Sequence, residues 1–223
     1  MLTCSSCAHK ECAKAPSLRG ELPANCPIAS ETATTGAMAE YRRPEVADFY
    51  ANAGYAAIHA KENRHPRIAE TVDFCRRMGY RHIGIASCIG SQRDADYCAR
   101  IFRREGFEVE TVICCAGGLN ELEIGVKIPE KYHDGPNYCA ACNPIGQAKL
   151  LNEAKTEFNL VLGLCVGHDS LFLKYAEAPC SILTVKDRLF PSNPVAGIYY
   201  AYGCLAPEGN SPLNCASVDD KSR

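Results

Sequence analysis

Four cysteines near the N-terminus have the residue type and the spacing of ligands for one metal ion. They occur as Cys4-x2-Cys7-x4-Cys12-x13-Cys26. A C-x2-C pair lets two thiolates reach a metal from a single turn, and two later cysteines can complete a tetrahedron. Zinc and a [4Fe–4S] cluster both accept four thiolates. The spacing therefore predicts a metal site at these four cysteines, with His9 as an alternative nitrogen ligand; the competing interpretation is four free thiols.

A second C-x2-C pair, Cys139 and Cys142, stands directly before Asn143-Pro144, where a helix is expected to begin. A thiol at a helix start faces backbone N–H groups and the positive end of the helix dipole, which favour the thiolate. This arrangement suits either a cofactor ligand or a reactive dithiol.

Two more cysteines, Cys88 and Cys165, lie at the carboxyl ends of two expected strands, at 81–88 and 160–165. In doubly wound sheets, binding sites form outside those ends. If the two strands are neighbours, Cys88 and Cys165 approach each other, and Cys139 and Cys142 could complete a four-thiolate site. The alternative is that strand cysteines are small core residues.

A third expected strand, at 107–115, ends in Cys114 and Cys115. Consecutive side chains of a strand face opposite ways, so only one of the two should point into a shared site. We include Cys115 among the cofactor-binding candidates. His168 follows Cys165 by three residues and could supply a proton, so the catalytic candidates are Cys88, Cys165 and His168.

The elements that would position these residues alternate between helix and strand. Apolar periodicity predicts helices at 45–63, 66–78, 92–105, 143–158 and 170–177, and the last strand at 180–186. Helix, strand, Cys-x-Gly turn and helix thus occur twice. We expect an α/β fold: a small, mostly parallel, doubly wound (Rossmann-like) sheet with helices on both faces. An N-terminal cysteine-rich metal module (1–43) precedes this α/β domain (44–223), which ends in a Pro/Gly-rich tail.

The remaining cysteines carry less specific signals. Cys75 and Cys98 have apolar neighbours at helical spacing and are expected in the core, and Cys180 begins a strand and is expected to serve packing. Cys204 and Cys215 fall in the tail, where ligand and bystander roles stay open.

Composition restricts the class of protein. Of 223 residues, 15 are cysteines, an odd number that cannot pair fully within the chain. The net charge of -2 and the lack of a Lys/Arg block speak against nucleic acid. No apolar run could cross a membrane, and the N-terminus lacks the features of a secretory signal. We therefore expect a cytoplasmic location, where thiols serve as metal ligands or redox groups. Glycine-rich nucleotide motifs and the G-x-S-x-G motif of serine hydrolases are absent.

The whole chain resembles the domain-of-unknown-function 1847 family, cysteine-rich proteins of anaerobic bacteria and archaea that are usually described as metal-binding. The resemblance rests on four segments: Cys4-Ser-Ser-Cys7 with Cys12 and Cys26-Pro27, Ile85-Ala-Ser-Cys88-Ile-Gly90, Cys139-Ala-Ala-Cys142-Asn-Pro144 and Gly163-Leu-Cys165-Val-Gly167-His168-Asp169. It implies metal binding and an anaerobic setting, and it implies no particular reaction.

The sequence thus leads to a metal-binding protein with an iron–sulfur cluster or zinc, and with a second cysteine site at the strand ends for redox chemistry, as in an oxidoreductase. Its partner would be a redox protein or a small-molecule substrate. One alternative is a metal-free thiol–disulfide oxidoreductase that uses Cys139 and Cys142. Another is a metal storage or delivery protein.

Overall fold

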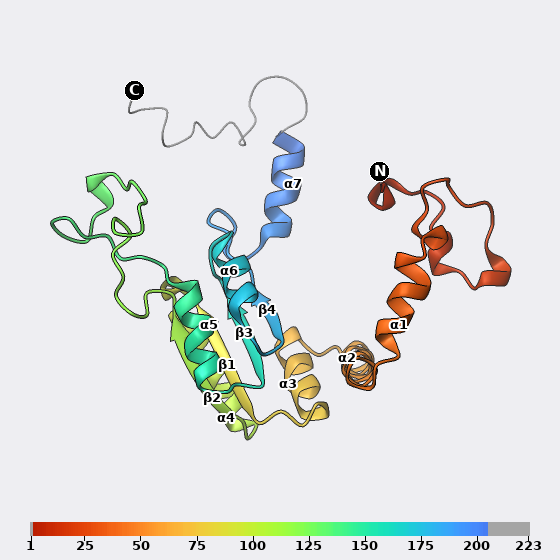
Figure 1. The fold of residues 1–223 in the computed structure, drawn as a ribbon, viewed down its shortest axis with the longest axis horizontal. Helices are drawn as coiled ribbons and strands as arrows, with labels where there is room; N and C mark the ends of the chain where they lie inside the picture. The colour runs from red at the N-terminus through yellow and green to blue at the C-terminus, as the bar shows by residue number, and fades with distance from the viewer. Residues whose placement is uncertain (1, 205–223) are drawn as a thin grey trace. The chain divides into compact units, whose positions relative to one another are not determined.

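The computed structural model describes residues 2–204, with side chains described for residues 2–200. The chain divides into two compact units, Met1–Asn63 and Arg64–Arg223. The sequence placed a boundary after residue 43, and the division differs because α2 (Pro44–Asn63) contacts α1 (Ala37–Tyr41). Figure 1 shows the order of the elements along the chain.

The N-terminal unit begins with short helical turns instead of a packed core. Its buried side chain among residues 2–43 is Glu11, whose carboxylate accepts hydrogen bonds from Lys14 Nζ and the Gly20 backbone N–H, each at 2.8 Å. The bond from Gly20 ties the second turn to the chain that follows the third turn. The turns that precede α1 are η1 (Cys4–Ser6), η2 (Glu11–Ala13), η3 (Pro16–Leu18), η4 (Pro27–Ala29) and η5 (Thr32–Gly36).

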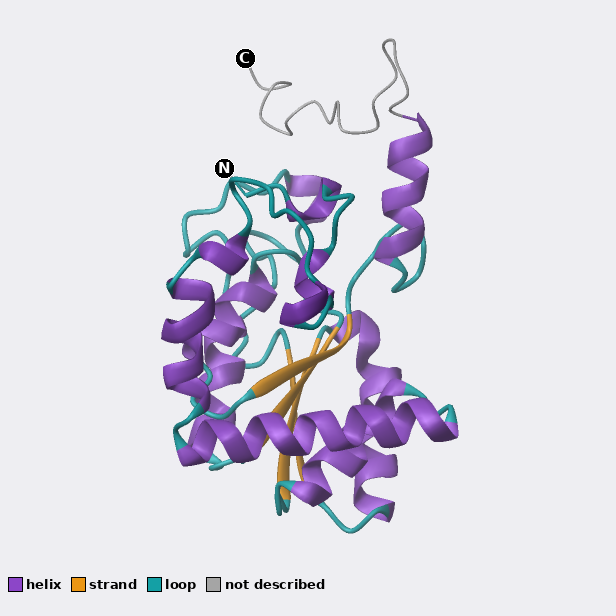
Figure 2. Cartoon of the chain, turned by 90° about the vertical axis from the view of Figure 1, so that its right-hand side faces the viewer, coloured by secondary structure: helices purple, strands orange, loops and turns teal. Residues whose placement is uncertain are grey.

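The second unit contains a four-stranded sheet of β1 (His82–Ser87), β2 (Glu108–Ile113), β3 (Phe158–Leu162) and β4 (Cys180–Thr184). The strand order is β2-β1-β3-β4, and every neighbouring pair is parallel. Figure 2 shows the strands side by side in a twisted sheet. The expected parallel sheet is confirmed. The helices of this unit are α3 (Arg67–Arg77), α4 (Gln92–Arg104), α5 (Pro144–Glu153), α6 (His168–Tyr175) and α7 (Pro194–Cys204).

Helices cover both faces of this sheet, as expected. On one face, the ring of Phe74 in α3 packs against Phe158, at 5.4 Å between ring centroids, and Phe158 pairs with Ile83 across β3 and β1. On the other face, Leu151 of α5 lies against Gly84. Because Ile83 and Gly84 are consecutive in β1, they face opposite sides of the sheet, and so do α3 and α5.

The ends of these helices follow from local sequence signals. Gly79 and Gly106 have φ values of 73° and 92°, the left-handed conformation that favours glycine after a helix, and they follow α3 and α4. Asn143 caps α5, because its Oδ1 accepts the Gly146 N–H at 2.8 Å. The capping places α5 directly after Cys142, as the sequence predicted.

Two of the structural cysteines lie in the core. Cys75 and Cys98 are buried, which confirms the expectation, and burial raises the pKa of each thiol to about 12. Cys180 is half-buried and packs against the apolar core under α5 and α6. Cys215 lies outside the described residues, and Cys204 ends α7 without a described side chain.

Candidate functional site

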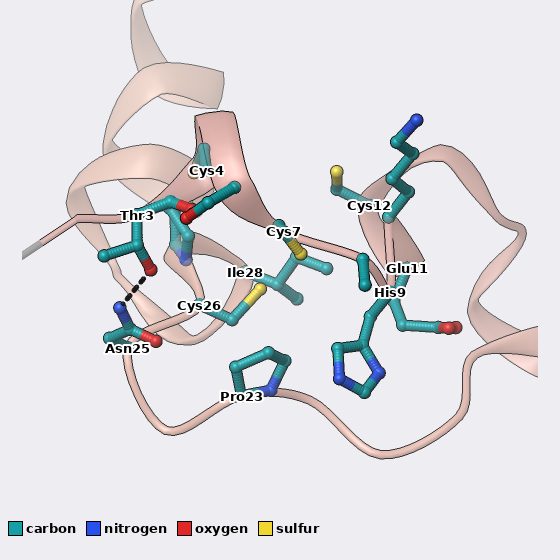
Figure 3. A pocket seen from close by; sticks show the side chains of 14 residues that line it. Thr3, Cys4, Cys7, His9, Glu11, Cys12, Pro23, Asn25, Cys26 and Ile28 are labelled. Atoms are coloured by element: carbon teal, nitrogen blue, oxygen red, sulfur yellow. Dashed lines mark hydrogen bonds between the residues drawn. The ribbon is translucent and has the colours of Figure 1, made fainter. Parts of the chain in front are cut away.

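The four N-terminal cysteines share one pocket. A cavity of about 550 Å3 in the N-terminal unit is lined by Cys4, Cys7, Cys12 and Cys26, together with His9. Figure 3 shows the sulfurs of Cys7 and Cys26 turned toward one another, whereas Cys12 comes from a separate turn and its sulfur points away from that pair. The set of residues that the spacing predicts is therefore gathered around one space.

Backbone turns hold this pocket together. The Cys7 N–H donates to the Cys4 carbonyl at 3.2 Å, so both thiols come from the single turn that a C-x2-C pair forms. The segment that carries Cys26 is tied to the N-terminus, because Asn25 Nδ2 donates to Thr3 Oγ1 at 2.8 Å.

The donors of this pocket are not yet arranged as a coordination sphere. Within residues 2–204, no three His, Cys, Asp or Glu side chains lie close enough together to hold a metal ion. Cys4 and Cys12 are exposed, and Cys7 and Cys26 are half-buried. Exposed side chains can rotate inward without displacing packed neighbours, so the chemistry of the donor set fits a four-thiolate centre.

A second group of cysteines lies at the carboxyl ends of the strands. Cys88 follows β1 and Cys165 follows β3, and these strands are neighbours in the sheet. The Cys88 N–H extends the pairing by donating to the Leu162 carbonyl at 3.1 Å. The chain leaves β1 toward β2 on one side and returns to β3 on the other, which makes this edge the switch point of the sheet. The expected proximity of the two βα turns is therefore present.

Two cations from the segment after β4 lie against these sulfurs. Lys186 Nζ is 2.7 Å from Cys88 Sγ and 3.6 Å from Cys165 Sγ. Arg188 Nη2 is 3.5 Å from Cys165 Sγ. The Asp187 carboxylate accepts the backbone N–H groups of Leu189 and Phe190 and so shapes the turn that carries both cations.

The charge state of Cys88 reflects these neighbours. Burial raises the pKa of its thiol, but hydrogen bonds from Lys186 and from the Gly90 N–H lower it more, so the pKa lies below its ordinary value. For Lys186, burial lowers the pKa, and the contacts with Cys88 and Cys165 outweigh it, so its pKa is raised. The pair is therefore stabilised as thiolate and ammonium.

Three further cysteines surround Cys88 on the same side of the sheet. Cys114 Sγ accepts the Ile89 N–H at 3.3 Å and lies 3.8 Å from Cys115 Sγ. The expectation that only one of Cys114 and Cys115 could join the site is wrong, because β2 ends at Ile113 and both cysteines stand in the following turn, where strand alternation no longer applies. Burial raises the pKa of Cys115 to about 11, and burial and Cys114 raise that of the nearby Cys142 to about 12.

Cys139 stands beside different groups from those around Cys88. Its Sγ lies 3.6 Å from Glu121 Oε2 and 3.6 Å from the Tyr132 carbonyl. Burial and the Glu121 carboxylate raise the pKa of this thiol. Cys142, by contrast, packs against the core cluster that contains Cys88 and Cys114, so the two thiols of the C-x2-C pair have different surroundings.

His168 begins α6, and its backbone N–H donates to the Cys165 carbonyl at 3.0 Å. Its Nδ1 is buried and, within the described residues, has no hydrogen-bond partner. An imidazole nitrogen left free in this way has an unused capacity to donate or accept a hydrogen bond. His168 therefore stays a candidate beside Cys165.

Sequence reasoning missed Lys186 and Arg188. Their signal was their position directly after β4, at the same edge of the sheet as Cys88 and Cys165. That edge becomes recognisable only once the strand order is known, because Lys186 is 98 residues from Cys88 in the sequence.

Comparison with known proteins identifies a relative and a family for this chain. An uncharacterized protein of Methanocaldococcus jannaschii is 34% identical over 203 residues, which cover 90% of this chain and 95% of the relative. No solved structure matches the chain. The model of the family described as Protein of unknown function (DUF1847) matches residues 26–183, more than half of the sequence. The chain thus belongs to the DUF1847 family, as its cysteine pattern suggested.

Proposed function

We propose that this chain is a metal-binding protein in which Cys4, Cys7, Cys12 and Cys26 hold one metal centre, either an iron–sulfur cluster or zinc. The observation that carries the proposal is that all four thiols line one pocket. Both kinds of centre accept four thiolates, and His9 at the same pocket is an alternative ligand for zinc.

The surroundings of the pocket favour a structural role for a bound metal. Among residues 2–43, Glu11 is the single buried side chain, so hydrophobic burial contributes little to the stability of this segment. Cys4 and Cys7 come from one turn, while Cys12 and Cys26 come from two others, and a shared metal would cross-link all three. Binding of a structural zinc contributes on the order of 10 kcal/mol to folding in small domains. An iron–sulfur cluster would add electron transfer to this structural role.

The test is purification of the full chain without oxygen, followed by metal analysis, sulfide analysis and the visible absorption spectrum. We expect either about one zinc per chain or iron with acid-labile sulfide and a brown colour. Cys26→Ser should lose most of that metal. Cys98→Ala, at a buried thiol in α4, should retain it. The proposal fails if the wild-type protein carries neither metal, or if Cys26→Ser carries as much as the wild type.

A metal storage or delivery role differs from this proposal in the response to chelation. A structural centre couples metal loss to unfolding, whereas a carrier releases metal with its fold unchanged. Far-UV circular dichroism during chelation distinguishes the two roles.

A cytoplasmic location belongs to the proposal. Within residues 2–204, no helix is both long and apolar enough to span a membrane.

The contacts of Cys139 do not favour a metal-free dithiol at Cys139 and Cys142. The Glu121 carboxylate lies beside the Cys139 sulfur, and a neighbouring negative charge disfavours a thiolate. Alkylation of reduced protein followed by peptide mapping would test this alternative. It requires Cys139 or Cys142 to be labelled before Cys88.

A further inference from the structure

We propose that Cys88 and Cys165 form a redox-active dithiol that reduces a disulfide substrate carrying negative charge, with Lys186 and Arg188 as its cationic groups. This activity goes beyond the proposed metal centre, because it uses none of the four N-terminal cysteines.

The distances place the two sulfurs within reach of each other. Both lie against one nitrogen, Lys186 Nζ, at 2.7 Å for Cys88 and 3.6 Å for Cys165. They can therefore be no further apart than these two distances together. The two residues follow neighbouring parallel strands, and side-chain rotation at such separations can bring sulfurs to bonding distance.

Exposure assigns a different part to each thiol. Cys88 is only 7% exposed, whereas Cys165 is half-buried and is followed by Val166, which is 91% exposed. A substrate disulfide arriving from solvent meets Cys165 first. Cys88 lies deeper and is therefore positioned for the second exchange, in which it attacks Cys165. Its sulfur already accepts hydrogen bonds from the Lys186 ammonium and the Gly90 N–H.

The reaction runs in two exchanges. The Cys165 thiolate attacks one sulfur of the substrate, the substrate S–S bond breaks, and the first substrate thiol leaves with a proton from solvent. The Cys88 thiolate then attacks Cys165 Sγ, forms the Cys88–Cys165 disulfide and releases the second substrate thiol. Each turnover moves two electrons from the protein to the substrate. A dithiol reductant, either a small molecule or a protein, restores the reduced pair by the reverse exchanges.

The charges around Cys165 define the substrate class. Arg188 is exposed and lies 3.5 Å from Cys165 Sγ, so a carboxylate or phosphate near the substrate sulfur would meet a guanidinium. The carboxylates nearest in sequence are engaged elsewhere. Asp169 accepts the N–H groups of Gly167 and Ser170, and Asp187 accepts those of its own turn.

The experiment uses the reduced full chain, freed of reductant without oxygen, with oxidised glutathione as the anionic probe. Samples are quenched with acid and mapped as non-reduced peptides. We expect the Cys88–Cys165 disulfide to form, with two glutathione thiols released for each disulfide. Cys88→Ser should trap a mixed disulfide between glutathione and Cys165, and Cys165→Ser should leave Cys88 reduced. Cys98→Ala is the matched control and should behave as the wild type.

Substituting Lys186 and substituting Arg188 should change two different measured quantities. Lys186→Met should slow the second exchange about tenfold, so that the Cys165 mixed disulfide accumulates, because one charge-assisted hydrogen bond to the attacking sulfur is lost. Lys186→Arg should restore most of the rate and shows that the fold is intact. Arg188→Gln should remove the preference for oxidised glutathione over the neutral probe 2-hydroxyethyl disulfide.

The proposal is overturned if Cys88 pairs with Cys114 or Cys115 instead of Cys165. It is equally overturned if both thiols stay reduced while other cysteines oxidise, as they would if they were metal ligands. An unchanged rate in Lys186→Met with circular dichroism like the wild type would remove Lys186 from the site.

Discussion

Replacing Gly84 by alanine should destabilise the sheet unit by about 3 kcal/mol, through a clash between neighbouring strands. Gly84 lies in β1 and pairs with Asn159 of β3. A Cβ atom at this position would overlap Asn159 Oδ1 and lie 2.9 Å from Leu151 Cδ1. Asn159 and Leu151 are fully buried, so neither side chain can move into solvent.

The magnitude combines two effects. Moving Asn159 breaks the hydrogen bond that Thr156 Oγ1 donates to its Oδ1 at 2.8 Å, and leaving a buried acceptor unpaired costs about 1–3 kcal/mol. Forcing one methyl group into a filled core costs a similar amount, about 1–3 kcal/mol. Gly84 itself has no left-handed backbone, so backbone strain adds nothing.

Guanidinium unfolding of the reduced protein, followed by far-UV circular dichroism, measures the loss. Gly54→Ala is the matched control: Gly54 lies inside α2 with open space around its Cα, and alanine there should stabilise the helix by about 1 kcal/mol. In an Asn159→Ala background, Gly84→Ala should cost less, because its main obstacle is gone. A loss below about 0.5 kcal/mol in the wild-type background would refute the reasoning.

Two further predictions concern stability. Phe102→Ala, at a fully buried ring of α4, should cost about 3–5 kcal/mol in the same unfolding assay, and a value near zero would show that this ring is not part of the core. Glu157 accepts the N–H groups of Arg81 and His82, which lower its pKa. Since the folded pKa is depressed, this stabilisation is present above the unfolded pKa and is lost as pH falls through the folded one. Because Glu157 is exposed, Glu157→Gln should cost only about 0.5 kcal/mol at pH 7 and nothing at pH 2, and an equal cost at both values would contradict the assignment.

The α/β alternation of this chain could be predicted from local signals. Ile83 and Ile85 mark β1, Gly79 marks the end of the helix before it, and Gly106 marks the end of the helix before β2. These are effects of neighbouring residues, so the sequence contains them directly. The strand expected at 107–115 extended too far at its C-terminal end, since β2 ends at Ile113. The turn at Cys114 and Cys115 is as apolar as a strand, so the sequence did not mark this end.

The composition of the strand-end site could be predicted only in part. Cys88 and Cys165 were expected together because both follow strands, and parallel strands end at one edge. That β1 and β3 are adjacent in the sheet could not be derived from the sequence, since the order of strands along the chain does not fix their order in the sheet. Lys186 was missed for that reason. Cys139 was expected beside Cys88 because the C-x2-C spacing does not show that Cys139 and Cys142 face different groups.

The turn after β4 ties the chemistry of Cys88 to the order in which the chain is synthesised. Lys186 is made 98 residues after Cys88, and it reaches the sulfur only when β4 has joined β3 at the edge of the sheet. A nascent chain that ends before β4 has both thiols but not the Lys186 ammonium that lowers the pKa of Cys88. The contact that lowers the pKa of Cys88 therefore forms only after the last strand of the sheet has been synthesised.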